Sequence, residues 1–415
     1  MMSVFDVPDM PPNEVGRRLR EIRAWRGQSL QVTAGLAGIS YGYLGKLERG
    51  EKPVSNRRTL EALARALQVS PAEFHTAPWA GSPPDATEAA RRGLAAVEYA
   101  LDAHELGDDP ECPVRDWPQI AADLDRLAHL TYGTSDYAEQ IELVPRLLAE
   151  LHAVHARVPT RRRDALVGLI VCYSSAVWTT KRLGGRGLPL LAARAAGQCA
   201  EELESPAWRG YAAWLRGDAT GGLSRPEQYR RAIRTADELR PYLDDAEVVQ
   251  ASGMLHLSAA LACAVQGDRD AATGHLAEAE ALATRLDTEV GTFGHMWFGT
   301  ANVGVWRVCI GHELGDGARI AEQARTVNVA ALPSLSRQAE FHMEVGRALL
   351  TDPRRRDEGV QMLLAAERCA PQRFYADVFV REAVADHLRA ARRDAGGRHL
   401  RGLAYRLRLA PELAP

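Results

Sequence analysis

Residues 29–50 read SLQVTAGLAGISYGYLGKLERG, and this stretch decides the fold of the N-terminal part of the chain. Apolar residues recur at helical spacing on both sides of Gly38, which predicts two short helices joined by a tight turn. Ser29 and Ser40 stand where the helices are expected to begin, and each hydroxyl can accept a hydrogen bond from a backbone N–H of the first turn. Gly50 then ends the second helix.

The second of these helices has two distinct faces. Leu44 and Leu47, three residues apart, predict a buried face, and Ile39 is expected to point into the same core. The opposite face carries Tyr41, Gly42, Tyr43 and Lys46. Aromatic and cationic side chains at the start of an exposed helix are suited to contacts in the major groove of DNA.

The flanking residues complete a five-helix module over residues 13–75. A preceding helix has an apolar stripe at i, i+4 and i+7, formed by Val15, Leu19 and Ile22. Its other face carries Arg17, Arg18, Arg20 and Arg23. A later helix repeats the apolar pattern at Leu60, Leu63, Ala64 and Leu67. Asn56 can cap that helix, and Ser70-Pro71 predicts a short fifth helix that ends near Phe74.

The ordered pattern S-x4-A-x3-G-I-S-x3-L-x2-L-E-R-G resembles the DNA-binding domain of lambda-repressor/Cro-like helix-turn-helix regulators, the XRE family. The resemblance implies double-stranded DNA as the partner. The residues expected to contact it are Arg17, Arg18, Ser29, Gln31, Ser40, Tyr41, Gly42, Tyr43, Lys46, Arg49, Lys52 and Arg57. Because one such domain reads about half of an operator, the resemblance also implies a homodimer on a pseudo-palindromic site.

The sequence departs from the family pattern at several positions. Leu30 stands where the family usually places a Gln that touches DNA, and Thr33 replaces a larger apolar residue. Gly42 and Gly45 fall inside the recognition helix, where each lowers intrinsic helix propensity by roughly 1 kcal/mol relative to Ala. We therefore expect a recognition helix that is soft until it meets DNA.

Charge is distributed unevenly along the chain. The net charge of all 415 residues is −3, but residues 13–67 carry eleven Lys and Arg against five Asp and Glu. A basic N-terminal module on an acidic body fits a duplex-binding surface confined to one end of the protein. Only three of the 51 basic residues are Lys, which indicates a GC-rich bacterial genome such as that of an actinobacterium.

The remaining composition bears on compartment and redox state. We find no run of about 18 apolar residues and no secretory signal at the N-terminus, so we expect a cytoplasmic protein with no membrane contact. Six cysteines lie at scattered positions without a CxxC pair: 112, 172, 199, 263, 309 and 369. They are expected to be reduced thiols within helices rather than a disulfide or metal framework.

A Pro, Gly and Ser-rich stretch over residues 77–85 predicts a linker between residues 1–76 and a large helical domain, residues 86–415. Gly-Asp recurs at 217–218, 267–268 and 315–316, where we expect turns between helices, and another hairpin is expected around Gly346. The recurrence resembles tetratricopeptide helical hairpins, so the expected fold class is all-α with a tetratricopeptide-like α-solenoid; a compact, non-repeating bundle is the alternative.

Residues 295–307 are the candidate ligand site of this domain. They combine aromatic and polar side chains, and the candidate contacts are His295, Trp297, Thr300, Asn302, Trp306 and Arg307. On a continuous helix, Trp297, Thr300 and Gly304 would share one face. The alternative is that these tryptophans only fill the core, and residues 208–214 are the next candidate. The resemblance to helix-turn-helix regulators with tetratricopeptide-type sensing domains implies a small-molecule or peptide effector.

Catalytic motifs are not found in the sequence. His152 and His155 lie three residues apart, but no third metal ligand accompanies them. No phosphate loop, nucleophile elbow or HExxH occurs, so we expect no enzyme, no metal and no cofactor. The function expected is a DNA-binding transcriptional regulator that senses an effector; the alternative is a DNA-anchored scaffold that recruits a protein partner.

Overall fold

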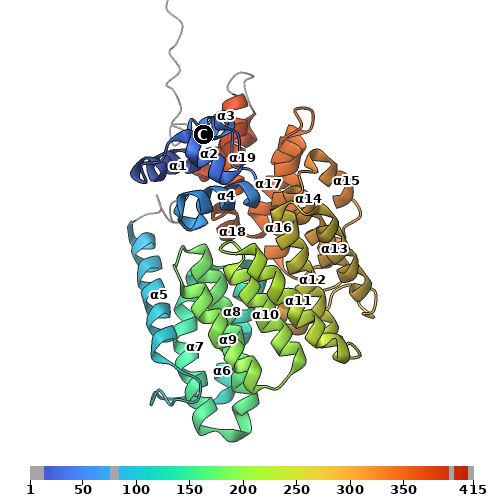
Figure 1. The fold of residues 1–415 in the computed structure, drawn as a ribbon. Coiled ribbons are helices and arrows are strands. Elements are labelled where there is room, and N and C mark those ends of the chain that lie inside the picture. The colour runs from blue at the N-terminus through green and yellow to red at the C-terminus, as the bar shows by residue number, and fades with distance from the viewer. Residues whose placement is uncertain (1–13, 75–83, 392–396, 410–415) are drawn as a thin grey trace, which may run out of the picture. The chain divides into compact units, whose positions relative to one another are not determined.

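The computed structural model describes residues 14–74, 84–391 and 397–409, and every regular element in these residues is a helix (Figure 1). The all-α fold class is therefore confirmed. The chain divides into two units, the first formed by residues 1–76 together with 378–415 and the second by residues 77–377. Residues 378–415 are thus grouped differently from the division expected from sequence, which placed them in the second domain.

The described N-terminal residues, 14–74, are called the head. Its helices are α1 (Glu14–Trp25), α2 (Leu30–Ala37), α3 (Tyr41–Glu48) and α4 (Arg57–Leu67), followed by a 3-10 helix, Pro71–Phe74. The predicted caps are confirmed, since Ser29, Ser40 and Asn56 accept hydrogen bonds from the backbone N–H groups of Val32, Tyr43 and Thr59. Gly38 adopts φ +65°, a left-handed conformation that glycine reaches without strain, and makes the turn between α2 and α3.

The core of the head contains the predicted apolar stripes. Leu19, Leu44 and Leu63 are fully buried, and Phe74 closes the core from the 3-10 helix. Thr33 is also buried, where its hydroxyl donates a 2.8 Å hydrogen bond to Gln28 Oε1, so this departure from the family pattern places a satisfied polar group in the core.

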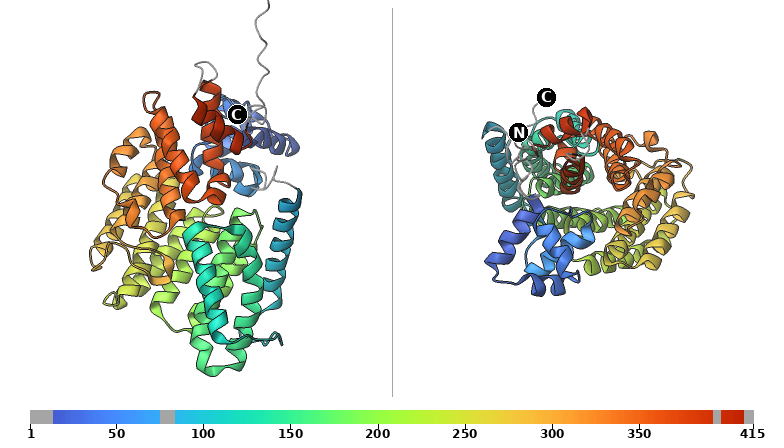
Figure 2. Two further views of the ribbon diagram at one scale, coloured as in Figure 1. Left: turned by 180° about the vertical axis from the view of Figure 1, so that it is seen from behind. Right: turned by 90° about the horizontal axis from the view of Figure 1, so that it is seen from above.

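Two helices from the end of the chain belong to the same unit as the head: α19 (Val378–Ala391) and α20 (Arg398–Arg406). Phe379 is buried to 7% exposure in the apolar core formed by α1 to α4. In Figures 1 and 2, α19 lies beside the head helices. The head is therefore completed by a residue more than 300 positions further along the chain.

The second unit, called the helical unit, consists of successive helices. They are α5 (Pro84–Ala103), α6 (Trp117–Ala128), α7 (Tyr137–Arg157), α8 (Arg162–Arg182), α9 (Leu188–Glu202), α10 (Pro206–Thr220), α11 (Arg225–Leu239), α12 (Ala246–Gln266), α13 (Arg269–Ala283), α14 (Thr300–Glu313), α15 (Ile320–Ala324), α16 (Leu335–Leu350), α17 (Arg356–Cys369) and α18 (Pro371–Tyr375). Consecutive helices pack side by side from α7 to α13, and α16 packs on α17, as in an α-solenoid (Figures 1 and 2). Of the expected linker, residues 84 and 85 belong to α5 and the others lie outside the described residues.

The Gly-Asp recurrence identified two turns out of three. Gly267 and Gly315 adopt φ +86° and +78° where α12 and α14 end, as expected. The expected turn at 217–218 is wrong, because both residues lie inside α10. A Cβ on Gly217 would lie 3.2 Å from Ser258 Oγ of α12, so this glycine allows two helices to approach closely rather than making a turn.

Helix α12 is the centre of the helical unit. Contrary to the expectation from sequence, it is long and apolar enough to span a membrane, but 89% of its apolar window is buried inside the protein. Helices α10, α11, α13 and α14 pack around it, so its hydrophobicity is explained by a position in the core. None of the six cysteines forms a disulfide bond in the described residues, and four of them are buried, as predicted; Cys112 and Cys369 are half-buried.

Candidate functional site

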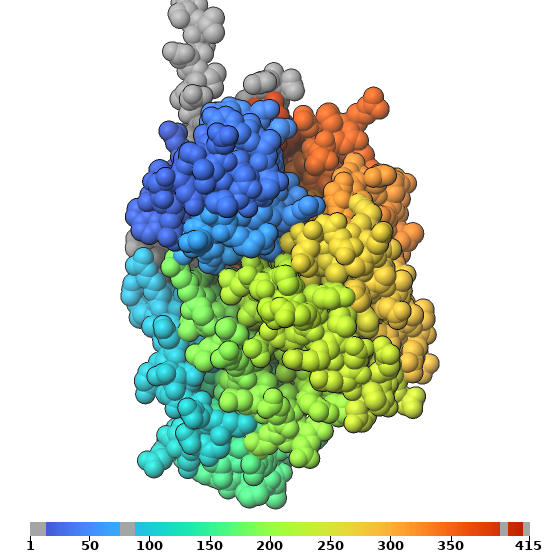
Figure 3. Space-filling view, in the orientation of Figure 1, coloured from blue at the N-terminus to red at the C-terminus, as the bar shows by residue number. Residues whose placement is uncertain are grey.

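The exposed face of α3 is the candidate surface for reading DNA. Tyr41 keeps 60% of its surface exposed, and Gly42 and Lys46 are exposed as well, whereas Leu44 and Leu47 are buried, as the spacing predicted. Ser29 and Gln31 are exposed at the start of α2, and Ser40 is exposed at the start of α3. On the side shown in Figure 3, the head (blue) has one continuous convex surface, which suits insertion into a groove rather than enclosure of a small ligand.

Tyr43 differs from the other residues of this face. Its ring is half-buried against the apolar core of the head, and its hydroxyl interacts with the Thr59 side chain. Burial raises the pKa of the Tyr43 phenol, with the Thr59 hydrogen bond acting in the opposite direction. Tyr43 thus supports α3 as well as lying near its exposed start.

The arginines of α1 have separate roles. Arg17 and Arg18 form ion pairs with Glu21, and Arg18 Nε also donates to the carbonyl oxygen of Glu73 at 3.2 Å. The hydrogen bonds that Glu21 accepts from Arg18 and Arg17 hold its pKa below the usual value, and the bond from Arg18 has the larger effect. Arg17 remains exposed on α1 and can exchange Glu21 for a DNA phosphate.

Arg23 was expected on the exposed face of α1, but it is bound to α3. Its guanidinium donates to both carboxylate oxygens of the buried Glu48, at 2.6 and 2.8 Å, and to the carbonyl oxygen of Gln28. A bidentate arginine-carboxylate pair fixes distance and orientation together. The pair therefore holds the recognition helix against α1. Gly16 of α1 lies so close to α3 that a Cβ on it would lie 2.1 Å from Leu47 O.

The segment between α3 and α4, residues 49–56, is called the α3–α4 loop. Arg49 forms an ion pair with Glu51 of the loop (2.5 Å), and Lys52 is exposed. Arg57, at the start of α4, lies with its guanidinium carbon 5.7 Å from the centre of the Phe379 ring. Sequence reasoning missed this contact because α19 carries no signal that relates it to the head.

A scan against known families matches residues 14–77 to a family described as a helix-turn-helix domain. No curated protein and no solved structure matched the chain. The family match and the geometry of α2 and α3 agree, so the chain contains an N-terminal helix-turn-helix domain and is a DNA-binding regulator in its general character.

The candidate ligand segment, residues 295–307, is not one continuous helix. Helix α14 begins only at Thr300, which is exposed, and the preceding residues form an irregular loop. His295 and Trp297 adopt φ +54° and +53°, values that bulky residues rarely reach, so the packing around them must hold this loop in place. The expected shared helical face of Trp297, Thr300 and Gly304 is therefore wrong.

The amide of Asn302 and the guanidinium of Arg307 bind other protein groups. Asn302 is 1% exposed; its Nδ2 donates to Met296 O at 2.9 Å, and its Oδ1 accepts from Arg337 Nε and Nη2 at 3.1 and 2.8 Å. The Arg337 guanidinium also lies 5.1 Å from the centre of the Trp306 ring, while Arg307 forms an ion pair with Glu280. A ligand would have to replace these bonds to use the same groups.

His295 joins a second interior cluster. Its ring stacks on Tyr132 at 4.7 Å, and the Tyr132 hydroxyl lies 3.0 Å from that of Tyr211, which in turn lies 2.8 Å from Ser174 Oγ. Trp208 and Trp214, in the segment that was the next ligand candidate, contact the Tyr211 ring edge-on. Trp208, Tyr211 and Trp214 form part of the core of the helical unit, and Trp297 and Trp306 pack against core clusters of the same unit, as the packing alternative expects.

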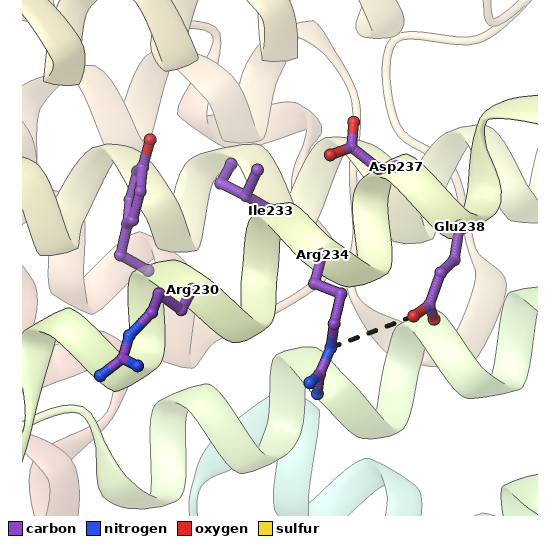
Figure 4. A pocket seen from close by; sticks show the side chains of 6 residues that line it. Arg230, Ile233, Arg234, Asp237 and Glu238 are labelled. Carbon is purple, nitrogen blue, oxygen red and sulfur yellow. Dashed lines mark ion pairs between the residues drawn. The ribbon is translucent and has the colours of Figure 1, made fainter.

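The surface of α11 contains a depression of about 610 Å³, but it includes none of the expected ligand residues. Its lining comes from this one helix: Tyr229, Arg230, Ile233, Arg234, Asp237 and Glu238. Ile233 and Asp237 point to one side of the helix, and Arg230 and Arg234 to the other (Figure 4). A depression without a second wall cannot enclose a ligand.

His152 and His155 have separate protein partners. His152 Nε2 lies 2.8 Å from the Tyr173 hydroxyl, and His155 Nε2 lies 2.7 Å from Glu202 Oε1. Burial, followed by the charges of His104 and His155, lowers the pKa of His152 to about 4. A buried histidine that stays neutral and donates or accepts within the core has a packing role.

Proposed function

We propose that the protein is a bacterial transcriptional regulator that binds a pseudo-palindromic operator as a homodimer and acts in the cytoplasm. The observation that supports this most is the exposed Tyr41 and Lys46 on a helix whose opposite face, Leu44 and Leu47, is buried. The Arg23–Glu48 pair attaches the end of that helix to α1 and so orients its exposed face. Residues 14–77 supply DNA binding in this proposal.

The proposed DNA contacts are tested with the full chain and fluorescently labelled duplexes. Lys46→Ala should weaken binding of operator and random duplex alike and reduce the salt dependence, because Lys46 would neutralise a phosphate. Tyr41→Ala should reduce the preference for the operator by about 1 to 3 kcal/mol, because its exposed ring would contact a base edge. Arg92→Ala removes one charge from exposed α5 and is the matched control. If both head variants bound both duplexes as the wild type does, α3 would not be the reading helix.

We further propose that the helical unit senses a small molecule or peptide and carries the dimer contact. Binding at the 295–307 segment would exchange the Asn302–Arg337 bonds for ligand bonds, and such an exchange can shift a two-state equilibrium. Asn302→Ala combined with Trp306→Ala should leave operator binding intact and abolish the response to cell extract. A normal response in a folded double variant would place the effector elsewhere.

The alternative function is a DNA-anchored scaffold whose helical unit recruits a protein. Native mass spectrometry of the purified full chain distinguishes the two proposals, since a bound small molecule or peptide supports the sensor and a bound protein supports the scaffold. The same spectrum reports the oligomeric state. A monomer at micromolar concentration, with and without duplex, would contradict the proposed homodimer.

A further inference from the structure

The α3–α4 loop and the start of α4 gather groups that suit a DNA backbone. This part of the chain carries four cationic side chains: Arg49, Lys52, Arg57 and Arg58. It also contains backbone N–H groups near the N-terminus of α4, where the helix dipole favours an anion. In protein–DNA complexes such groups hold phosphates and so set the position of the protein on the duplex.

An anionic group of the chain already occupies part of this loop. The carboxylate of Glu382, on α19, is 4% exposed, and its Oε2 accepts a 3.2 Å hydrogen bond from the backbone N–H of Val54. One turn earlier on α19, Phe379 lies below the Arg57 guanidinium. Two different groups that could face a phosphate are therefore engaged by one helix.

A second set of contacts holds α19 in this position. Arg381 Nη2 donates to Glu14 Oε2 of α1 at 3.2 Å, and Arg381 Nη1 donates to the carbonyl oxygen of Leu407, just after α20. Phe379 adds an apolar anchor in the core of the head. Helix α19 is thus attached to the head at three points: α1, the α3–α4 loop and the core.

We infer that α19 and the DNA backbone compete for the α3–α4 loop, so that the docked α19 holds the head in a state of lower affinity for duplex. A carboxylate on a backbone N–H in a cationic loop has the chemistry of a bound phosphate, and both cannot occupy the Val54 N–H at once. A buried Glu382 also opposes the approach of the negatively charged backbone. This inference rests on the proposed function, because it assumes that the head binds DNA.

The competition gives the helical unit a route to the head along the chain itself. Helix α18 ends at Tyr375, and α19 begins at Val378, so two residues separate an element of the helical unit from the competing helix. Gln372 of α18 is bonded to the start of α7, where its side chain accepts from Tyr137 N and donates to Asp136 Oδ1, both at 2.8 Å. A rearrangement there changes the attachment of α19, and linkage requires that DNA binding and α19 docking weaken each other equally.

The test uses the full chain and a random-sequence duplex over a range of salt concentrations. Glu382→Gln keeps the size of the side chain and an oxygen acceptor for Val54 but removes the competing charge. Because a neutral amide oxygen holds the Val54 N–H less strongly than a carboxylate does, a phosphate can displace it. We expect about a three- to tenfold higher affinity for duplex and a log–log salt slope steeper by about 0.9, the value for one additional phosphate contact. Asp386→Asn is the matched control, because Asp386 lies one turn further on α19 and pairs with Arg389.

Each outcome bears on the inference. An affinity of Glu382→Gln that equals that of Asp386→Asn, or falls below the wild type, would overturn the competition and leave the DNA-binding function in place. Failure of every protein, wild type included, to bind any duplex would instead overturn the proposed function. Arg381→Gln releases the Glu14 contact without touching the loop and should give a smaller increase, which provides a second variant if Glu382→Gln unfolds.

Amide hydrogen exchange tests the competition directly, because a purely structural α19 would exchange at the same rate with and without duplex. Adding saturating duplex to the wild type should slow exchange in residues 49–57 and accelerate it in residues 378–391. If both segments became slower together, α19 would remain docked in the complex, and the inference would be wrong.

Discussion

The head and the 295–307 segment of the helical unit use similar residue types in opposite ways. On the head, Tyr41 and Lys46 are exposed. In the helical unit, Asn302 and His295 face inward, where each contacts other side chains. Aromatic and polar side chains are therefore directly available to an external partner only where the backbone presents them outward. In the helical unit the same groups hold an irregular loop in place, and a ligand would have to replace their bonds.

The two units also differ in what completes their cores, and two phenylalanines at 374 and 379 give the sharpest test. Phe379→Ala should destabilise the head by about 3 kcal/mol, because its ring is buried there. Phe374→Ala, only five residues earlier and fully buried, should destabilise the helical unit and leave the head unchanged. Hydrogen exchange resolved by region measures both effects. If either variant reduced the protection of the head and the helical unit equally, the assignment of Phe379 to the head and of Phe374 to the helical unit would be wrong.

The second-largest expected difference is in stability at acidic pH, which should fall in the helical unit and not in the head. Six histidines of the helical unit have a pKa lowered mainly by burial: His104, His152, His256, His275, His295 and His342. Because such a histidine takes up its proton more readily after unfolding, stability is complete above pH about 6.5 and falls as the pH drops towards the folded pKa. His152 alone, at about 4, should remove about 2 kcal/mol by pH 5.

Residues 14–74 contain no histidine, so the head provides the internal control. Region-resolved hydrogen exchange at pH 7 and pH 5, corrected for the intrinsic exchange rate, measures the difference. His152→Gln should make the helical unit less sensitive to this change of pH. An equal loss of protection in the head and the helical unit would show that buried histidines do not control the acid response.

Two glycines of the head differ in whether a neighbouring helix leaves room for a methyl group. Gly16→Ala should destabilise the head by about 2 kcal/mol and weaken duplex binding, because the new methyl group would overlap the Leu47 carbonyl and push α3 away from α1. Gly35→Ala, on α2, meets no atom within 4 Å and should stabilise the head slightly. Thermal unfolding of the two variants in parallel measures the contrast. A stable Gly16→Ala protein with full affinity would mean that α1 and α3 can separate without loss.

The smallest expected effect concerns the softness of the recognition helix. Gly42 is exposed on α3, and a Cβ there would meet no atom within 4 Å. Gly42→Ala should therefore stabilise the head by about 1 kcal/mol through helix propensity alone. Thermal unfolding followed by hydrogen exchange of residues 41–48 measures the change. If Gly42→Ala left the exchange rate of residues 41–48 unchanged, Gly42 would not be what makes α3 soft.

Local sequence signals were sufficient to predict the helices of the head, but they were insufficient to predict all turns of the helical unit. Ser29, Gly38 and Ser40 act on backbone groups within four residues, so the sequence contains both partners of each interaction side by side. The Gly-Asp pair at 217–218 shows the limit, because the same dipeptide ends a helix at 267–268 and lies inside one at 217–218. At Gly217 the side chains of Ser258 and Gln228 come from two other helices, and such neighbours are invisible to a local pattern.

The candidate sites follow the same rule. The exposed face of α3 could be predicted because helical spacing alone decides which side Leu44 and Leu47 bury. The loop before α14 could not, since His295 and Trp297 adopt left-handed conformations that only their tertiary contacts maintain. The contact between Glu382 and Val54 joins positions 328 residues apart, and nothing near either residue announces the other.

That separation has a consequence for synthesis. Because synthesis runs from the N-terminus, a nascent chain contains all four head helices more than 300 residues before Phe379 is added. Until then the core of the head lacks one of its aromatic side chains and the α3–α4 loop lacks α19. The head is therefore synthesised well before the residue that closes its core, and this long-range closure must wait until α19 has been made. Messages truncated before the α19 codons would yield heads without this closure.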